Sequence, residues 1–129
     1  MSLVRTGQLD HRWQRAKVLQ DYHAGLLRRE DICDADFLLK TAARFHGYKR
    51  TETAKSSRCP ICEKEDIAIV LWVHGEELGR ASGSARSWQE IEEFAREGKV
   101  FDVHRVEVCP DCGWNFLLTQ QTVRWENEP

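Results

Sequence analysis

Two matched pairs of cysteines give this sequence its clearest chemical signal. Cys59 and Cys62 form one C-P-x-C motif, and Cys109 and Cys112 form a second after 46 intervening residues. Each motif offers two thiolates from one short turn, and two such turns complete the tetrahedral four-thiolate shell that binds Zn²⁺. The proline stiffens each turn, and Gly113 can take the positive φ that closes the second one. The spacing predicts one structural zinc ion per chain.

Other uses of these residues fit the pattern less well. A redox pair needs an exposed thiol of low pKa, which four thiolates bound to one metal do not provide. His74 and His104 could each replace a sulfur ligand, but the two motifs already supply enough ligands. The fifth cysteine, Cys33, lies 26 residues before Cys59 and has no partner motif. It is predicted to be a small buried hydrophobic residue.

Length and charge limit the classes of protein to consider. The chain has 129 residues and a formal net charge of −2, which fits one domain or two small lobes. No run reaches the ~18 apolar residues of a membrane span, and the N-terminus has no apolar signal core, so we expect a cytoplasmic protein. Residues 1–58 carry 12 Lys/Arg against 7 Asp/Glu, whereas residues 59–129 carry 7 against 14. Any contact with a polyanion is therefore expected in the first half.

Residues 1–58 are predicted to be a basic helical region. Its first helix would present an apolar stripe at three- and four-residue steps. The stripe consists of Leu9, Trp13, Ala16, Leu19, Tyr22 and Leu26. A second helix would follow Asp34 as its N-cap and end before Gly47, and residues 48–58 are predicted to be a linker.

Residues 59–129 are predicted to be a zinc-ribbon-like domain with a helical insert near 87–98. Ser87 and Glu90 form a capping box at the start of that helix. Branched and aromatic residues favour strands at 67–73, 101–108 and 114–125. We therefore expect an α+β fold, in which an N-terminal helical arm packs on a four-cysteine zinc ribbon of about three antiparallel strands.

Three cations of the first predicted helix are candidates for contact with a partner. Arg12, Arg15 and Lys17 fall on its polar side and could contact a phosphate backbone. A solvated helix face explains them more simply, because the overall charge is balanced.

A second group of candidates lies in the loop over residues 79–87, which precedes a helix N-terminus. Its Arg80 and Arg86, together with free amides and the helix dipole, could bind a phosphate or a carboxylate. The loop lacks the Gly-Lys-Ser/Thr end of a P-loop. An ordinary connection is the simpler interpretation.

Several short motifs together resemble a small actinobacterial family of unknown function. They are Cys33-Asp34-Ala35, Ala42-Ala43-Arg44-Phe45-His46-Gly47, the first C-P-x-C motif, Gly75 to Gly79 with Ser82-Gly83, and Val106 to Asn115. The resemblance covers nearly the whole chain and implies a cytoplasmic, bacterial protein of zinc-ribbon type. It implies no activity, so it assigns no functional residue beyond the cysteines.

These observations favour a binding protein over an enzyme. No G-x-S-x-G, H-E-x-x-H or paired-carboxylate motif is present, so no enzymatic activity is expected. We expect a zinc-stabilised interaction module that docks on a macromolecular machine such as RNA polymerase or the ribosome, by analogy with zinc ribbons at large. Direct nucleic-acid binding through the basic first half is the first alternative, and would depend steeply on salt. A small-anion-binding or enzymatic protein that uses the 79–87 loop is the second, and its ligand would raise thermal stability.

Overall fold

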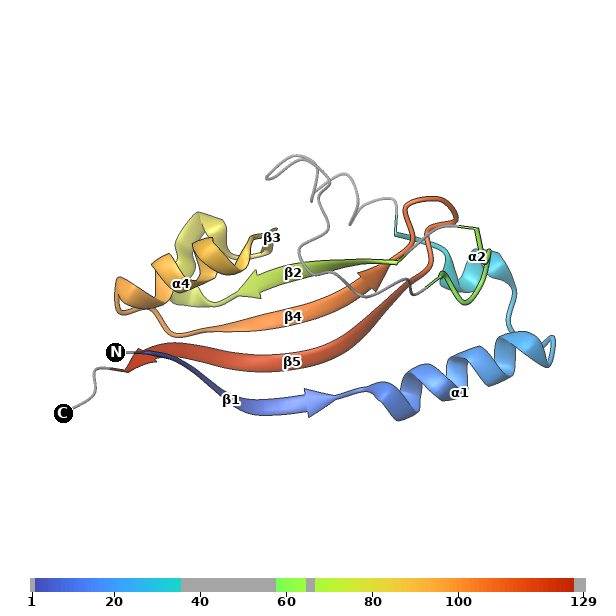
Figure 1. Cartoon of the computed structure of the whole chain (residues 1–129), viewed down its shortest axis with the longest axis horizontal. Coiled ribbons are helices and arrows are strands. Elements are labelled where there is room, and N and C mark those ends of the chain that lie inside the picture. The colour runs from blue at the N-terminus through green and yellow to red at the C-terminus, as the bar shows by residue number, and fades with distance from the viewer. Residues whose placement is uncertain (1, 36–57, 65–66, 127–129) are drawn as a thin grey trace.

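The computed structural model describes residues 2–35, 58–64 and 67–126, and it shows an α+β protein built on one antiparallel sheet (Figure 1). The strands predicted at 67–73, 101–108 and 114–125 and the helix predicted near 87–98 are confirmed. The elements are β1 (Ser2–Asp10), α1 (Arg12–His23), α2 (Arg29–Ile32), β2 (Ala68–His74), the 3₁₀ helix η1 (Glu76–Ala81), β3 (Ser84–Ala85), α4 (Trp88–Arg96), β4 (Phe101–Val108) and β5 (Asn115–Glu126). The second helix and most of the linker predicted in the first half fall on residues 36–57, outside the described residues.

The sheet is larger than the three-stranded ribbon expected from the sequence. Its five strands are ordered β1-β5-β4-β2-β3, and all neighbours are antiparallel. Ala68 at the start of β2 pairs with Val108 at the end of β4, and Val108 also pairs with Asn115 at the start of β5. The segment that enters β2 and the segment that joins β4 to β5 therefore meet at one end of the sheet.

The N-terminus differs most from the sequence-based expectation. Ser2–Asp10 forms β1, an edge strand paired with β5, and α1 begins only at Arg12. The predicted apolar stripe is therefore wrong at both ends, where Leu9 and Leu26 are 55% and 73% exposed. Pairing with a strand from the far end of the chain decides the structure here, because strand formation depends on neighbouring strands more than on local preference.

The face of α1 that packs against the protein also differs from the predicted one. Trp13, expected in the apolar stripe, is 79% exposed, whereas Arg15, expected on the polar side, is half-buried. Val18, Leu19 and Tyr22 pack against the cluster that contains the cysteines. The second half of α1 is therefore fixed to the cysteine end of the sheet.

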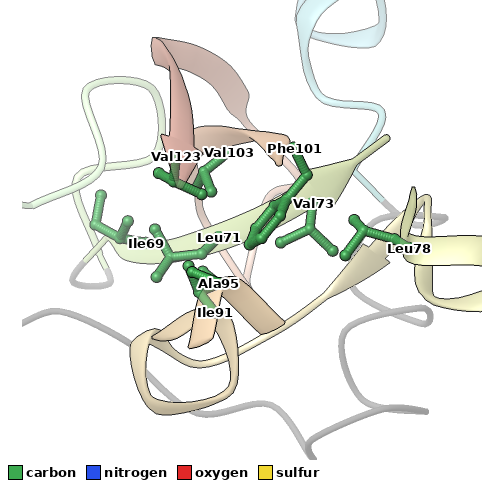
Figure 2. Packing of buried hydrophobic residues seen from close by; sticks show 9 residues of the cluster. All are labelled: Ile69, Leu71, Val73, Leu78, Ile91, Ala95, Phe101, Val103 and Val123. Atoms are coloured by element: carbon green, nitrogen blue, oxygen red, sulfur yellow. The ribbon is translucent and has the colours of Figure 1, made fainter. Parts of the chain in front are cut away.

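A hydrophobic core lies between α4 and one face of the sheet, at the end away from α1 (Figures 1 and 2). The capping box at the start of α4 is confirmed, since Ser87 Oγ accepts a hydrogen bond from the Glu90 amide at 3.2 Å. The core consists of Ile69, Leu71, Val73, Leu78, Ile91, Ala95, Phe101, Val103 and Val123. Burial of each large side chain stabilises the fold by about 1.5–3 kcal/mol. This end of the sheet thus has a core that does not include the cysteines.

Candidate metal centre

The four motif cysteines meet in one cluster at the end of the sheet. Their four Sγ atoms all lie within 4.8 Å of one another, and Cys59–Cys112 and Cys62–Cys109 are each 3.6 Å apart. Sulfurs on a tetrahedral ion with metal–sulfur bonds of about 2.3 Å stand about 3.8 Å apart. The spacing fits one mononuclear tetrathiolate site, whereas a multinuclear iron–sulfur cluster would hold its sulfurs further apart.

Backbone amides of both turns point at the sulfurs. The Ile61 amide donates to Cys59 Sγ at 3.4 Å, and the Cys112 amide donates to Cys109 Sγ at 3.5 Å. Such hydrogen bonds from outside the ligand shell orient thiolates and stabilise their negative charge. Each turn therefore holds the sulfur of its first cysteine in place with a backbone amide.

Both turns close through a residue with positive φ. Gly113 has φ +87° and donates its amide to the Cys109 carbonyl at 3.1 Å. Glu63 has φ +59°, and its amide donates to the Cys59 carbonyl at 3.0 Å. It therefore occupies the position in the first turn that Gly113 occupies in the second. The sequence indicated only the second of these positions, because glutamate carries no preference for this conformation.

Burial sets the protonation of the cysteines. Cys59 and Cys109 are almost fully buried, and burial raises the pKa of both thiols and raises that of Cys112 to about 12. A bound cation would favour the thiolate form, so metal binding at this centre would displace protons from the thiols. The fully buried Trp114 packs beside them and excludes water from one side of the centre.

The structure places Cys33 beside this centre, which the sequence did not predict. Its Sγ lies 3.9 Å from Cys112 Sγ, and the residue forms an isolated β-bridge with Trp114. Gly113 permits the approach, since a Cβ there would stand 3.1 Å from the Cys33 carbonyl oxygen. Cys33 is half-buried, and burial raises the pKa of its thiol. Within the described part of the chain, the metal-binding group contains the other four cysteines, and Cys33 packs against it.

We expect Cys33→Ser to keep the full metal content, because four ligands remain in place. Elemental analysis of the purified variant should give about one metal ion per chain. Cys112→Ser is the matched control, since it removes the neighbouring sulfur and should lower the content. Metal lost from Cys33→Ser and kept in Cys112→Ser would identify Cys33 as the fourth ligand.

The candidate cations of the first half are engaged in ion pairs. Arg12 lies 3.5 Å from Asp10, and Lys17 lies 2.7 Å from Asp21. Arg15 forms a two-pronged contact with Glu107 of β4, with Nε on one carboxylate oxygen and Nη2 on the other at 3.2 Å. The Glu107 side chain is only 4% exposed, so Arg15 neutralises a buried charge. The position of Glu107 between Val106 and Val108 is the sequence signal that could have indicated a buried charge, which the sequence-based predictions did not include.

The 79–87 segment is structured, and its two arginines differ. η1 buries Leu78, and Arg86 donates to Ser84 Oγ at 2.9 Å and to Glu90 at 3.0 Å. Arg80 lies exposed at the end of η1. The structure does not bring these residues together with the cysteines or with α1.

His74 and His104, the alternative sulfur replacements, lie on adjacent strands and outside the cysteine group. Their ring centroids are 4.6 Å apart. No helix in the described residues combines the length and apolar character required to cross a membrane.

Comparison with known proteins agrees with the motifs. Residues 3–128 match the model of a family of unknown function, DUF5318. The chain is 42% identical over 112 residues to the uncharacterized protein Rv0049 of Mycobacterium tuberculosis, an alignment that covers 85% of this chain and 77% of the relative. The uncharacterized protein Mb0050 of Mycobacterium bovis gives the same values. No solved structure gives a significant match. The resemblance to an actinobacterial family is thereby confirmed, and the chain belongs to the family of unknown function DUF5318.

Proposed function

We propose that this protein is a zinc-stabilised, non-enzymatic interaction module of the bacterial cytoplasm that docks on a macromolecular machine. Four thiolates complete the shell of a zinc ion and leave no position for water or substrate, so the metal would have a structural role. The Sγ separations of 3.6 Å support a single ion of this kind. RNA polymerase and the ribosome are the first partners to test.

The exposed Trp13 is the observation that supports docking. Four large apolar residues are exposed in the described part of the chain, and three of them, Leu9, Trp13 and Leu26, lie in or beside α1. Tryptophan is enriched among the residues that contribute most to protein–protein affinity. Val18, Leu19 and Tyr22 meanwhile hold the helix on the cysteine end of the sheet. Trp13 would therefore be exposed to a partner on a helix that is itself fixed to the sheet.

The ion pairs of α1 favour a protein partner over nucleic acid. Arg12, Arg15 and Lys17 each contact a carboxylate of this chain. Proteins gain affinity for nucleic acid when their lysines and arginines replace the salt ions bound to the phosphates. Cations that are already paired within the protein contribute less to this affinity. Direct nucleic-acid binding through this half remains the alternative outcome of the test below.

We expect Trp13→Ala to weaken capture of the partner by more than tenfold, because hot-spot tryptophans contribute about 2 kcal/mol or more. Purified mycobacterial RNA polymerase and ribosomes would be titrated onto the immobilised metal-loaded protein. Val100→Ala is the matched control, since Val100 is also exposed, at 43%, but lies between α4 and β4 in the chain. Figure 1 shows α4 at the end of the sheet away from α1. Thermal stability should be unchanged in both variants.

Three outcomes would count against this proposal. Retention of neither machine by the unmodified protein would reject the partners, and equal retention by Trp13→Ala would reject the α1 surface. Binding that survives in Trp13→Ala but falls steeply with salt, on arbitrary nucleic acid, would support the nucleic-acid alternative instead.

A further inference from the structure

Three potential metal ligands lie near one another on the face of the sheet opposite α4. His74 of β2 pairs directly with Asp102 of β4, and His104 lies two residues further along β4 on the same face. The rings of His74 and His104 lie 4.6 Å apart, centroid to centroid. Both histidines are half-buried.

We propose that His74 and His104, assisted by Asp102, form a second binding site for a divalent transition metal ion such as Zn²⁺, Ni²⁺ or Co²⁺. Imidazole and carboxylate are suitable ligands for these ions, and two histidines with one carboxylate leave coordination positions open. This inference does not depend on the docking proposal.

The spacing of the rings suits a shared ion. With a metal–nitrogen bond of about 2.1 Å, a ring centroid stands about 3.2 Å from the metal. Two rings separated by 4.6 Å then subtend about 90° at the ion, the angle between neighbouring ligands in an octahedral shell. This separation is compatible with an ion bound by both rings, and it also falls within the usual range of packed rings.

Asp102 supplies charge and a further ligand atom. One of its oxygens, Oδ1, accepts a hydrogen bond from Thr122 Oγ1 at 2.7 Å. Within the described residues, the cysteine cluster is the group in which three or more ligand atoms already lie within 4.8 Å. Asp102 would therefore bind through a water molecule or after a turn of its side chain away from Thr122.

The two histidines are available as ligands near neutral pH. Burial lowers the pKa of both rings, and the neighbouring His74 and the nearby His11 lower that of His104 further, while the charge of Asp102 opposes the shift in both. Neutral imidazole offers the lone pair that a metal requires.

The second site would be separate from the cysteines. His104 precedes Cys109 by five residues along β4, and an extended strand advances about 3.3 Å per residue. The two sites would thus lie roughly 17 Å apart along one strand. One would be a closed site of soft thiolates, and the other an open site of harder ligands from which the ion exchanges more readily.

Co²⁺ titrated into the zinc-loaded protein tests this proposal. We expect about one further Co²⁺ per chain with weak d–d absorption, because a shell of nitrogen, oxygen and water ligands gives no thiolate-to-metal charge-transfer band. Intense charge-transfer absorption with release of zinc would instead show exchange at the cysteines, and it would overturn the proposal if no weaker site remained.

Variants identify the ligands. The double variant His74→Gln/His104→Gln should lose the second Co²⁺ while it keeps its zinc, and Asp102→Asn should weaken binding about tenfold or more. His23→Gln is the matched control, because His23 is exposed on α1. Should the double variant fail to fold, paramagnetic broadening of the His74 and His104 ring signals in the unmodified protein gives the same answer. A second Co²⁺ that persists in the folded double variant, or broadening confined to other histidines, would refute the site.

Discussion

Cys109→Ser is expected to abolish metal binding and to unfold the cysteine end of the sheet. Cys109 is fully buried at the end of β4, and its amide donates to the Trp114 carbonyl at 2.8 Å. Structural zinc in small peptides contributes about 10–16 kcal/mol, which is comparable with the whole stability of a domain. Loss of one ligand should therefore remove the ion and leave polar thiols in an apolar cluster.

The unfolding should be local in its first stage, because the core under α4 contains no cysteine. Amide exchange should become fast around Trp114 and Cys59, while the amides of Leu71 and Ile91 remain protected. Chelation of the metal from the unmodified protein should produce the same pattern. Elemental analysis, thermal unfolding and hydrogen exchange by mass spectrometry measure the three effects.

Cys33→Ser provides the comparison for this result, since it removes a sulfur from the same neighbourhood without removing a proposed ligand. Full metal content and an unchanged melting temperature in Cys109→Ser would contradict the metal centre. Simultaneous loss of protection at Leu71 would show that the two ends of the sheet unfold as one unit.

The features that were predictable from the sequence are those with a local cause. The C-P-x-C turns, the capping box of Ser87 and the central strands each follow from residues within a few positions of one another. The close approach of the four sulfurs was also predicted, because antiparallel strands bring the two C-P-x-C turns to the same end of the sheet. The residues of the two turns and their suitability as metal ligands therefore sufficed to predict the cysteine end of the protein.

The features that the sequence did not predict depend on contacts between distant segments. β1 is a strand because it pairs with β5, whereas the apolar stripe that predicted a helix began already at Leu9, within this strand. Cys33 reaches the cysteine end through a bridge to Trp114, a residue 81 positions further along the chain. Glu63 closes the first C-P-x-C turn with a positive φ, which the sequence did not predict because the residue at this position is not a glycine.

Arg15→Gln is the second change for which we expect a large effect, although the sequence alone predicts an exposed helix face for Arg15. The substitution leaves the Glu107 carboxylate without its cation in a position that is 4% exposed. Breaking a buried pair by removing one partner costs about 3–5 kcal/mol, and the 29% exposure of the Arg15 side chain places this case at the lower end. A loss of about 3 kcal/mol should lower the melting temperature by roughly 10 °C in a domain of this size.

Two further variants isolate the buried charge as the cause. Arg15→Gln/Glu107→Gln should recover part of the loss, because two neutral amides can hydrogen-bond to each other where an unpaired carboxylate cannot. Lys17→Gln is the control on the same helix: its pair with Asp21 is exposed, so its loss should change stability by less than about 0.5 kcal/mol. A double-mutant cycle across Arg15 and Glu107 then gives the coupling free energy directly. If Arg15→Gln were as mild as Lys17→Gln, the pair would not hold in solution, and the packing of Val18, Leu19 and Tyr22 would still hold α1 on the cysteine end.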